Sequence, residues 1–148
     1  MTPDDLALLI HAGATGVMAG LVLFVHVVHY PLIARVGPDE FVGFNREHQR
    51  RTTWVVAPAM LFELVSAWWI ALGWARIGVP AWAAWAGIGL LGVVWLSTFA
   101  VQVPTHGRLL RGKDVGRVAL LVRWNLPRTL AWGARFVLAL WMLHAAWR

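Results

Sequence analysis

The chain has 148 residues, of which 59% are hydrophobic and 14% charged, and its formal net charge is +6. This composition is typical of a membrane protein and argues against a soluble globular domain. The absence of cysteine excludes disulfides, thiolate metal sites and cysteine nucleophiles. Because most basic residues flank apolar stretches, the positive charge indicates membrane topology and not nucleic-acid binding.

Four apolar stretches each approach the ~20 residues that a helix needs to cross the hydrocarbon core of a bilayer. We expect an all-α protein, an integral membrane four-helix bundle of up-down topology, in which residues 1–148 form a single transmembrane domain. The predicted spans cover about residues 6–33, 54–75, 81–103 and 126–147.

The first span follows two acidic residues, Asp4 and Asp5, at the place where a signal peptide would carry basic residues. We therefore expect a retained helix. Gly16 and Gly20 within it form a GxxxG pattern, in which small side chains let a second backbone approach closely. This pattern predicts packing against a neighbouring helix.

The sequence FVHVVHYP, residues 24–31, places two imidazoles and a proline at the end of the first span. His26 and His29 are three residues apart, so they share a helix face and can hold one ion or flank one ligand. Neutral imidazole is a ligand for zinc, copper, iron and nickel. Pro31 removes the backbone donor that would bond the carbonyl of Val27. Together these features predict the rim of a polar site.

A tight turn at residues 35–39 leads into a polar segment, residues 40–53, which carries Asn45 and His48. If the hairpin folds about Gly37 and both helices are continuous, His26 lies level with His48, and His29 with Asn45. The segment can stand upright on the bundle or lie along the membrane surface. That choice decides whether His48 reaches the histidines of the first span.

Glu63 lies near the middle of the second span, and Arg135 lies at the same depth of the fourth, which runs in the same direction. A carboxylate inside a membrane is unfavourable and is usually paired. We expect a Glu63–Arg135 ion pair that joins the two helices. A proton-relay or metal-binding carboxylate is the alternative, and the hairpin register offers His11 as a different partner.

The third span ends at Pro104, and His106 follows it. Before the fourth span, Asn125 could cap a helix that has Pro127 in its first turn. Alternatively, one longer helix runs through Pro127 with a kink.

Segments from all four predicted helices therefore bring polar side chains to one end of the bundle. We expect a transition metal or haem there, with Asn45, Asn125 and Arg128 orienting a substrate. The alternatives are a substrate site without a metal, and histidines that only bond neighbouring backbone or lipid headgroups. The candidate metal ligands are His26, His29, His48 and His106.

Basic residues gather in or beside the first and third connections. The positive-inside rule then puts these connections in the cytoplasm and both termini outside, and we expect the membrane to be the bacterial inner membrane. The residues concerned are Arg35, Arg46, Arg50, Arg51, Arg108, Arg111, Lys113, Arg117, Arg123 and Arg128.

The segment RWNLPRT, residues 123–129, follows Val103-Pro104 at a short distance. This pattern resembles the end of the anthrone-oxygenase-like family of small four-helix integral membrane proteins. The likeness covers mainly the last third of the chain, and the HxxHYP segment is not matched to the family. The resemblance implies oxygenation of aromatic polyketides, and Asn125 and Arg128 are the positions that it carries over.

These patterns predict a small integral membrane oxidoreductase, similar to an oxygenase, with its site at the cytoplasmic end of the bundle. Its hydrophobic small-molecule substrate would arrive from the lipid bilayer. The alternative is a non-enzymatic transport or accessory subunit, which packs against a second copy of the chain or a membrane partner. In that case Glu63 and Arg135 serve only to hold the helices together.

Overall fold

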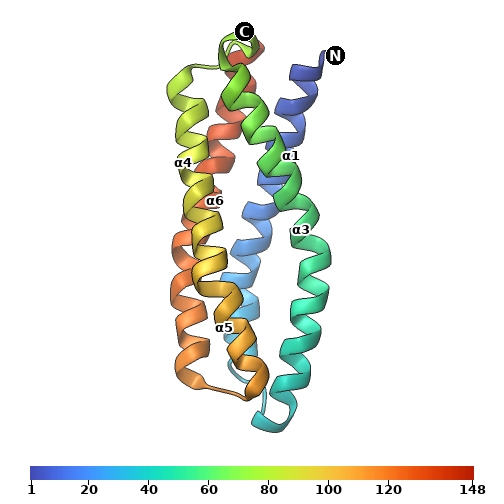
Figure 1. Ribbon diagram of the computed structural model, residues 1–148, viewed down its shortest axis with the longest axis vertical. Coiled ribbons are helices and arrows are strands. Elements are labelled where there is room, and N and C mark those ends of the chain that lie inside the picture. Colours follow the sequence, from blue (N-terminus) through green and yellow to red (C-terminus); the bar gives the residue numbers. More distant parts are fainter.

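A computed structural model describes residues 1–148 as four long helical rods with no strands (Figure 1). Two of the rods are interrupted by short segments in which the α-helix changes to a wider π-helix or a tighter 3-10 helix. The first rod comprises α1 (Pro3–Phe24), the π-helix η1 (Val25–His29) and α2 (Tyr30–Ile33), and the second is α3 (Pro38–Ile77). The third comprises α4 (Ala81–Ser97), the π-helix η2 (Thr98–Gln102), α5 (Val103–Arg108) and the 3-10 helix η3 (Leu109–Arg111), and the fourth is α6 (Val115–Ala146).

The rods run alternately up and down, so both chain termini lie at one end of the bundle (Figure 1). We call the opposite end, which holds the first and third connections, the connecting end. Each rod is long and apolar enough to cross a membrane. Large apolar side chains are exposed along the outer surface, as lipid contact requires. The expected all-α, integral membrane, four-helix up-down bundle is confirmed.

The second rod is a single helix of 40 residues. At 1.5 Å per residue its length is about 60 Å, roughly twice the thickness of the hydrocarbon core. The polar segment 40–53 therefore stands upright on the bundle and does not lie along the membrane surface. Its buried residues, Phe41 and Asn45, pack inward at the connecting end.

The fourth rod settles the choice between the two expectations for Pro127. α6 runs unbroken from Val115 to Ala146, with Asn125 and Pro127 in its interior, so the cap predicted at Asn125 is wrong. The cap is Asp114, whose side chain accepts a hydrogen bond from the backbone N–H of Arg117. The hydrogen bond from that N–H lowers the pKa of the Asp114 carboxyl below its ordinary value, and the hydrogen bond from the Arg117 guanidinium adds a smaller effect in the same direction. Pro127 deprives only one carbonyl of its donor, which long membrane helices tolerate.

Two prolines at the connecting end, Pro31 and Pro104, each follow a π-helix. Pro31 comes two residues after η1, and Pro104 comes two residues after η2. In each wide turn a backbone N–H reaches back five residues, from Tyr30 to Val25 and from Val103 to Thr98. Such turns inside α-helices are often found at functional sites.

Three buried apolar clusters follow one another along the bundle. The cluster at the terminal end includes Leu8, Ile70 and Met142, and the middle cluster includes Met18 and Trp132. The cluster at the connecting end is made of Tyr30, Ile33, Phe41, Leu109, Val118 and Leu121.

Only one glycine of the GxxxG pattern, Gly16, lies at a contact between α1 and another helix. A Cβ atom on Gly16 would lie 2.8 Å from Cε2 of Phe136 on α6, whereas one on Gly20 would meet nothing within 4 Å. We expect Gly16→Val to lower the free energy of unfolding by about 1–3 kcal/mol, because the aromatic ring must move. Gly20→Val is the matched control and should change the stability by less than about 1 kcal/mol, because a Cβ there meets nothing within 4 Å. Equal losses in detergent unfolding curves would contradict this packing.

Candidate functional site

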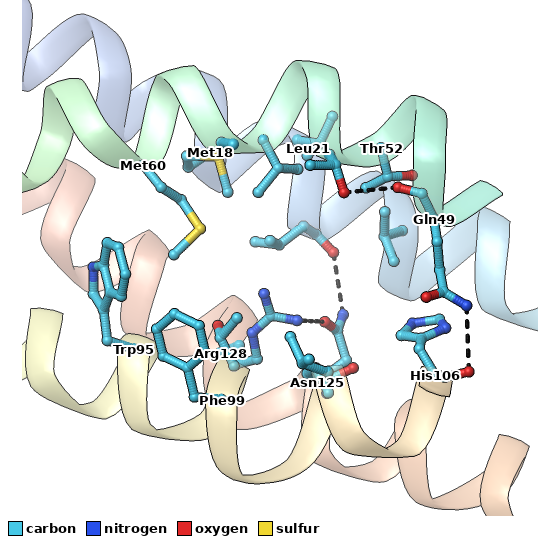
Figure 2. A pocket seen from close by; sticks show the side chains of 18 of the residues that line it. Met18, Leu21, Gln49, Thr52, Met60, Trp95, Phe99, His106, Asn125 and Arg128 are labelled. Carbon is cyan, nitrogen blue, oxygen red and sulfur yellow. Dashed lines mark hydrogen bonds between the residues drawn. The ribbon is translucent and has the colours of Figure 1, made fainter. Parts of the chain in front are cut away.

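A cavity of about 450 Å³ lies inside the bundle toward the connecting end (Figure 2). All four rods contribute to its wall. Most of the 21 lining side chains are hydrophobic, and Met18, Met60, Trp95 and Phe99 supply much of the apolar part. No acidic side chain lines it. The polar lining residues are Tyr30, His48, Gln49, Thr52, Thr53, Thr98, Gln102, His106, Asn125 and Arg128.

Asn125 on α6 bridges the fourth and first rods. Its amide Nδ2 donates to the backbone oxygen of Val22 at 3.3 Å and to the hydroxyl of Thr129 at 3.3 Å. Its Oδ1 accepts a hydrogen bond from Nη1 of Arg128 at 3.3 Å. Asn125 is fully buried, so this amide fixes the direction of the arginine inside the cavity, as Figure 2 shows.

Arg128 is a buried cation, with 8% of its surface exposed. Its guanidinium lies over the ring of Trp132, 5.2 Å from the ring centroid. Such a contact partly compensates the lost hydration of the charge. Apart from the single bond to Asn125, the guanidinium has no hydrogen-bond partner in the protein, and its Nε is buried without one. No carboxylate forms an ion pair with it.

Tyr30 and Gln102 form a second polar pair across the cavity wall. The Tyr30 hydroxyl donates to Oε1 of Gln102 at 3.0 Å. The remaining amide nitrogen of Gln102 is buried and has no partner, as is the indole nitrogen of Trp95. Sequence reasoning missed Tyr30 as a site residue, although it directly follows His29 in the HxxHYP segment.

His106 is held in place by two residues of α3. Asn45 donates from Nδ2 to the backbone oxygen of His106 at 3.2 Å, and its Oδ1 lies 3.1 Å from the ring Nδ1. Gln49 donates to the same backbone oxygen at 3.2 Å. Asn45 does not line the cavity, so the structure places this predicted substrate ligand behind His106, as a positioning residue.

Three of the four predicted metal ligands come together. The rings of His29 and His48 are stacked with centroids 4.2 Å apart, and those of His48 and His106 are 5.6 Å apart. His26 makes no ring contact with them, and only His48 and His106 line the cavity. No group of three histidine or acidic side chains is arranged to hold a metal ion. A transition metal or haem at these residues therefore stays a prediction.

The predicted register of the first hairpin was wrong by three residues. His48 lies beside His29 and not beside His26. The connection between α2 and α3 carries the chain farther from the bundle before α3 begins (Figure 1). α3 must therefore rise through more residues before it returns to the level of the first rod.

Glu63 and Arg135 form the expected ion pair in the middle of the bundle, outside the cavity. Nε of Arg135 lies 2.9 Å from Oε1 of Glu63, and both side chains are almost fully buried. The indole nitrogen of Trp132 donates to the same carboxylate at 3.0 Å, and Nη1 of Arg135 donates to the backbone oxygen of Gly87. These bonds join α3, α4 and α6, which favours a structural role. The other suggested partner, His11, bonds the hydroxyl of Ser66 at 3.1 Å instead.

Comparisons of the chain with protein-family models, curated proteins and solved structures find no match.

Proposed function

We propose that the protein binds a hydrophobic small molecule in the cavity and acts on it as a small membrane oxidoreductase, similar to an oxygenase. The observation that carries the binding step is the composition of the cavity wall. Apolar side chains surround most of its volume, while Asn125, Arg128, Gln102 and His106 bring polar groups to one region. Concave, mostly apolar sites with a few fixed polar groups are typical of small-molecule binding.

The position of the cavity supports access from the lipid. Several lining side chains are also exposed on the outer surface of the bundle, namely Leu61 on α3, Phe99 on η2 and Val103 on α5. The cavity therefore reaches the lipid-facing surface between the second and third rods. A molecule dissolved in the membrane can enter there without crossing water.

The chemical step rests on groups that face the same space. His48, His106 and Tyr30 line the cavity and can exchange protons with a bound molecule. Of the predicted haem ligands, only His48 and His106 are in this position. A transition metal or haem bound there would supply the oxidation or reduction, which these side chains cannot provide by themselves.

The proposed orientation puts the connecting end in the cytoplasm of a bacterium, with the protein in the inner membrane. The basic residues of the first and third connections support it. Arg35, Arg46, Arg50, Arg51, Arg108, Arg111 and Arg123 are exposed at this end. In that orientation the cavity lies at the level of the inner leaflet.

A cavity-filling variant tests the binding step. Ala57 lines the cavity, so we expect Ala57→Phe to abolish binding of an uncharged hydrophobic fluorophore to the purified protein. Val65→Phe, on the lipid-facing surface of the same helix, is the control and should bind as the native protein does. Binding would be followed by quenching of tryptophan fluorescence, since Trp95 lies in the cavity wall.

Equal dye binding by the native protein and the Ala57→Phe variant would overturn the proposal. It would favour the alternative, a non-enzymatic transport or accessory subunit that packs against a partner or a second copy. An absorption spectrum and elemental analysis of the same preparation test the redox part, because a Soret band that is lost in His48→Ala and His106→Ala would support a haem enzyme.

A further inference from the structure

Two buried arginines on α6 differ in how their charges are balanced. Arg128 and Arg135 are seven residues apart, so they lie on the same face of the helix. Arg135 is paired with Glu63 at 2.9 Å, whereas Arg128 has no carboxylate partner. A guanidinium keeps its charge at every physiological pH. The cavity therefore contains one positive charge that the protein does not neutralise.

The fully buried side-chain atoms of the cavity wall that lack a hydrogen-bond partner are all donors. The buried polar atoms without partners are Nε of Arg128, Nε2 of Gln102 and Nε1 of Trp95. The acceptors beside them are already used, because Oε1 of Gln102 accepts from Tyr30 and Oδ1 of Asn125 accepts from Arg128. A ligand that satisfies these three atoms must offer acceptors.

The charge and the donors together define the head group of the ligand. A neutral ketone or quinone accepts hydrogen bonds but leaves the guanidinium charge uncompensated. A carboxylate accepts several hydrogen bonds and carries one negative charge, and its bonds to a guanidinium are the stronger, charge-assisted kind. The acidic residues of the chain supply no such group, since none lines the cavity.

We propose, on the basis of the function proposed above, that the ligand of this cavity is a hydrophobic monocarboxylate. Its carboxylate binds the Arg128 guanidinium and the free amide nitrogen of Gln102. Its apolar part lies along Met60, Trp95 and Phe99, which Figure 2 shows on one side of Arg128 in the cavity wall. From there it extends toward the opening between α3 and η2. A fatty acid from the membrane and an aromatic acid both meet this description.

Matched acid and alcohol pairs test the proposal. The protein in nanodiscs of uncharged, zwitterionic lipid is titrated with hexadecanoate and hexadecan-1-ol, and with 2-naphthoate and 2-naphthalenemethanol. We expect at least one acid to bind about tenfold or more tightly than its alcohol, because only the acid neutralises Arg128. Preference for hexadecanoate alone identifies a lipid-derived ligand, and preference for naphthoate alone an aromatic one.

Variants of α6 assign the preference to one side chain. Arg128→Gln should remove the preference for the acid and leave the affinity for the alcohol unchanged, while Arg128→Lys should keep part of it. Arg123→Gln, which removes an exposed charge from the same helix, is the control and should keep the full preference. If Arg128→Gln does not fold, the native protein still provides the test, because the preference must vanish at a pH where the acid is protonated.

Two results would overturn the inference, and they differ in what they say of the binding step. Acid and alcohol that bind equally well to the native protein would show a hydrophobic site without charge selection, so the proposed binding function would survive. If none of the four compounds binds and the fluorophore does not distinguish Ala57→Phe from the native protein, both proposals fail together.

Discussion

Replacing Arg135 with methionine is expected to lower the free energy of unfolding by about 3–5 kcal/mol, because Glu63 would be left buried without its counter-charge. The Glu63 carboxylate is fully buried, and the lost guanidinium also bonds the backbone of α4 at Gly87. Only the indole nitrogen of Trp132 would remain as a donor to it. Unfolding of the purified protein in a mixed-micelle titration with a denaturing detergent measures the loss.

Two further variants distinguish the stability lost with the ion pair from the stability lost when any buried arginine is replaced. Arg128→Met removes a buried charge that has no carboxylate partner, so we expect it to leave the stability unchanged or to raise it. The double variant Glu63→Met/Arg135→Met should recover much of the loss, because replacing both members of a buried pair with apolar groups is often nearly neutral. Losses of similar size for Arg128→Met and Arg135→Met would contradict the distinction drawn between the two arginines.

Replacing Phe41 with alanine is expected to cost about 3–5 kcal/mol of stability. Phe41 has no exposed surface and packs with Ile33, Leu109 and Leu121 in the cluster at the connecting end. Because the segment 40–53 is polar, this cluster lies beyond the hydrocarbon core of the membrane, where the helices are surrounded by water. There the hydrophobic effect favours burial of apolar side chains, whereas lipid provides no such driving force between helices. The cavity left by the ring would loosen the end of α3 that holds Asn45 against His106.

Phe44→Ala is the matched control for Phe41→Ala, since it lies on the same helix with 39% of its surface exposed. Its loss should stay below about 1 kcal/mol, because little apolar area is buried there. Stability is again measured by detergent unfolding, and amide hydrogen exchange at residues 38–50 reports the local loosening. Equal effects of the two substitutions would show that the connecting end is not a packed core.

Regular helices explain which parts of the structure the sequence could predict. Glu63 and Arg135 were matched by counting residues into two spans that run in the same direction, and the count holds because both helices are uninterrupted at that depth. The same counting failed for His26, because the residues between α2 and α3 do not follow helical geometry. Counting along a rod is reliable only while the backbone stays helical.

The cavity itself was only partly visible in the sequence. Arg128 was singled out because it lies close to Asn125 at the polar end of the bundle and within the RWNLPRT segment. Gln102 and Tyr30 are ordinary residues at a membrane interface, and no spacing rule brings them together across 72 positions. Their pairing, and the donors that it leaves free, depend on the packing of two rods.

The wide turn at Val25–His29 changes which residue of the first rod faces the ligand. Met18, Leu21, Val22 and Val25 line the cavity at α-helical spacing, and in an unbroken α-helix the next position on that face is His29. The π-helix takes up one additional residue, so Tyr30 occupies that place and the imidazole rotates toward α3. An unbroken α-helix of the same length would put the His29 imidazole at the wall, whereas deletion of one residue within the turn would restore the α-helix and keep the Tyr30 phenol there. The chemistry of this surface is thus set by helical phase as well as by residue type.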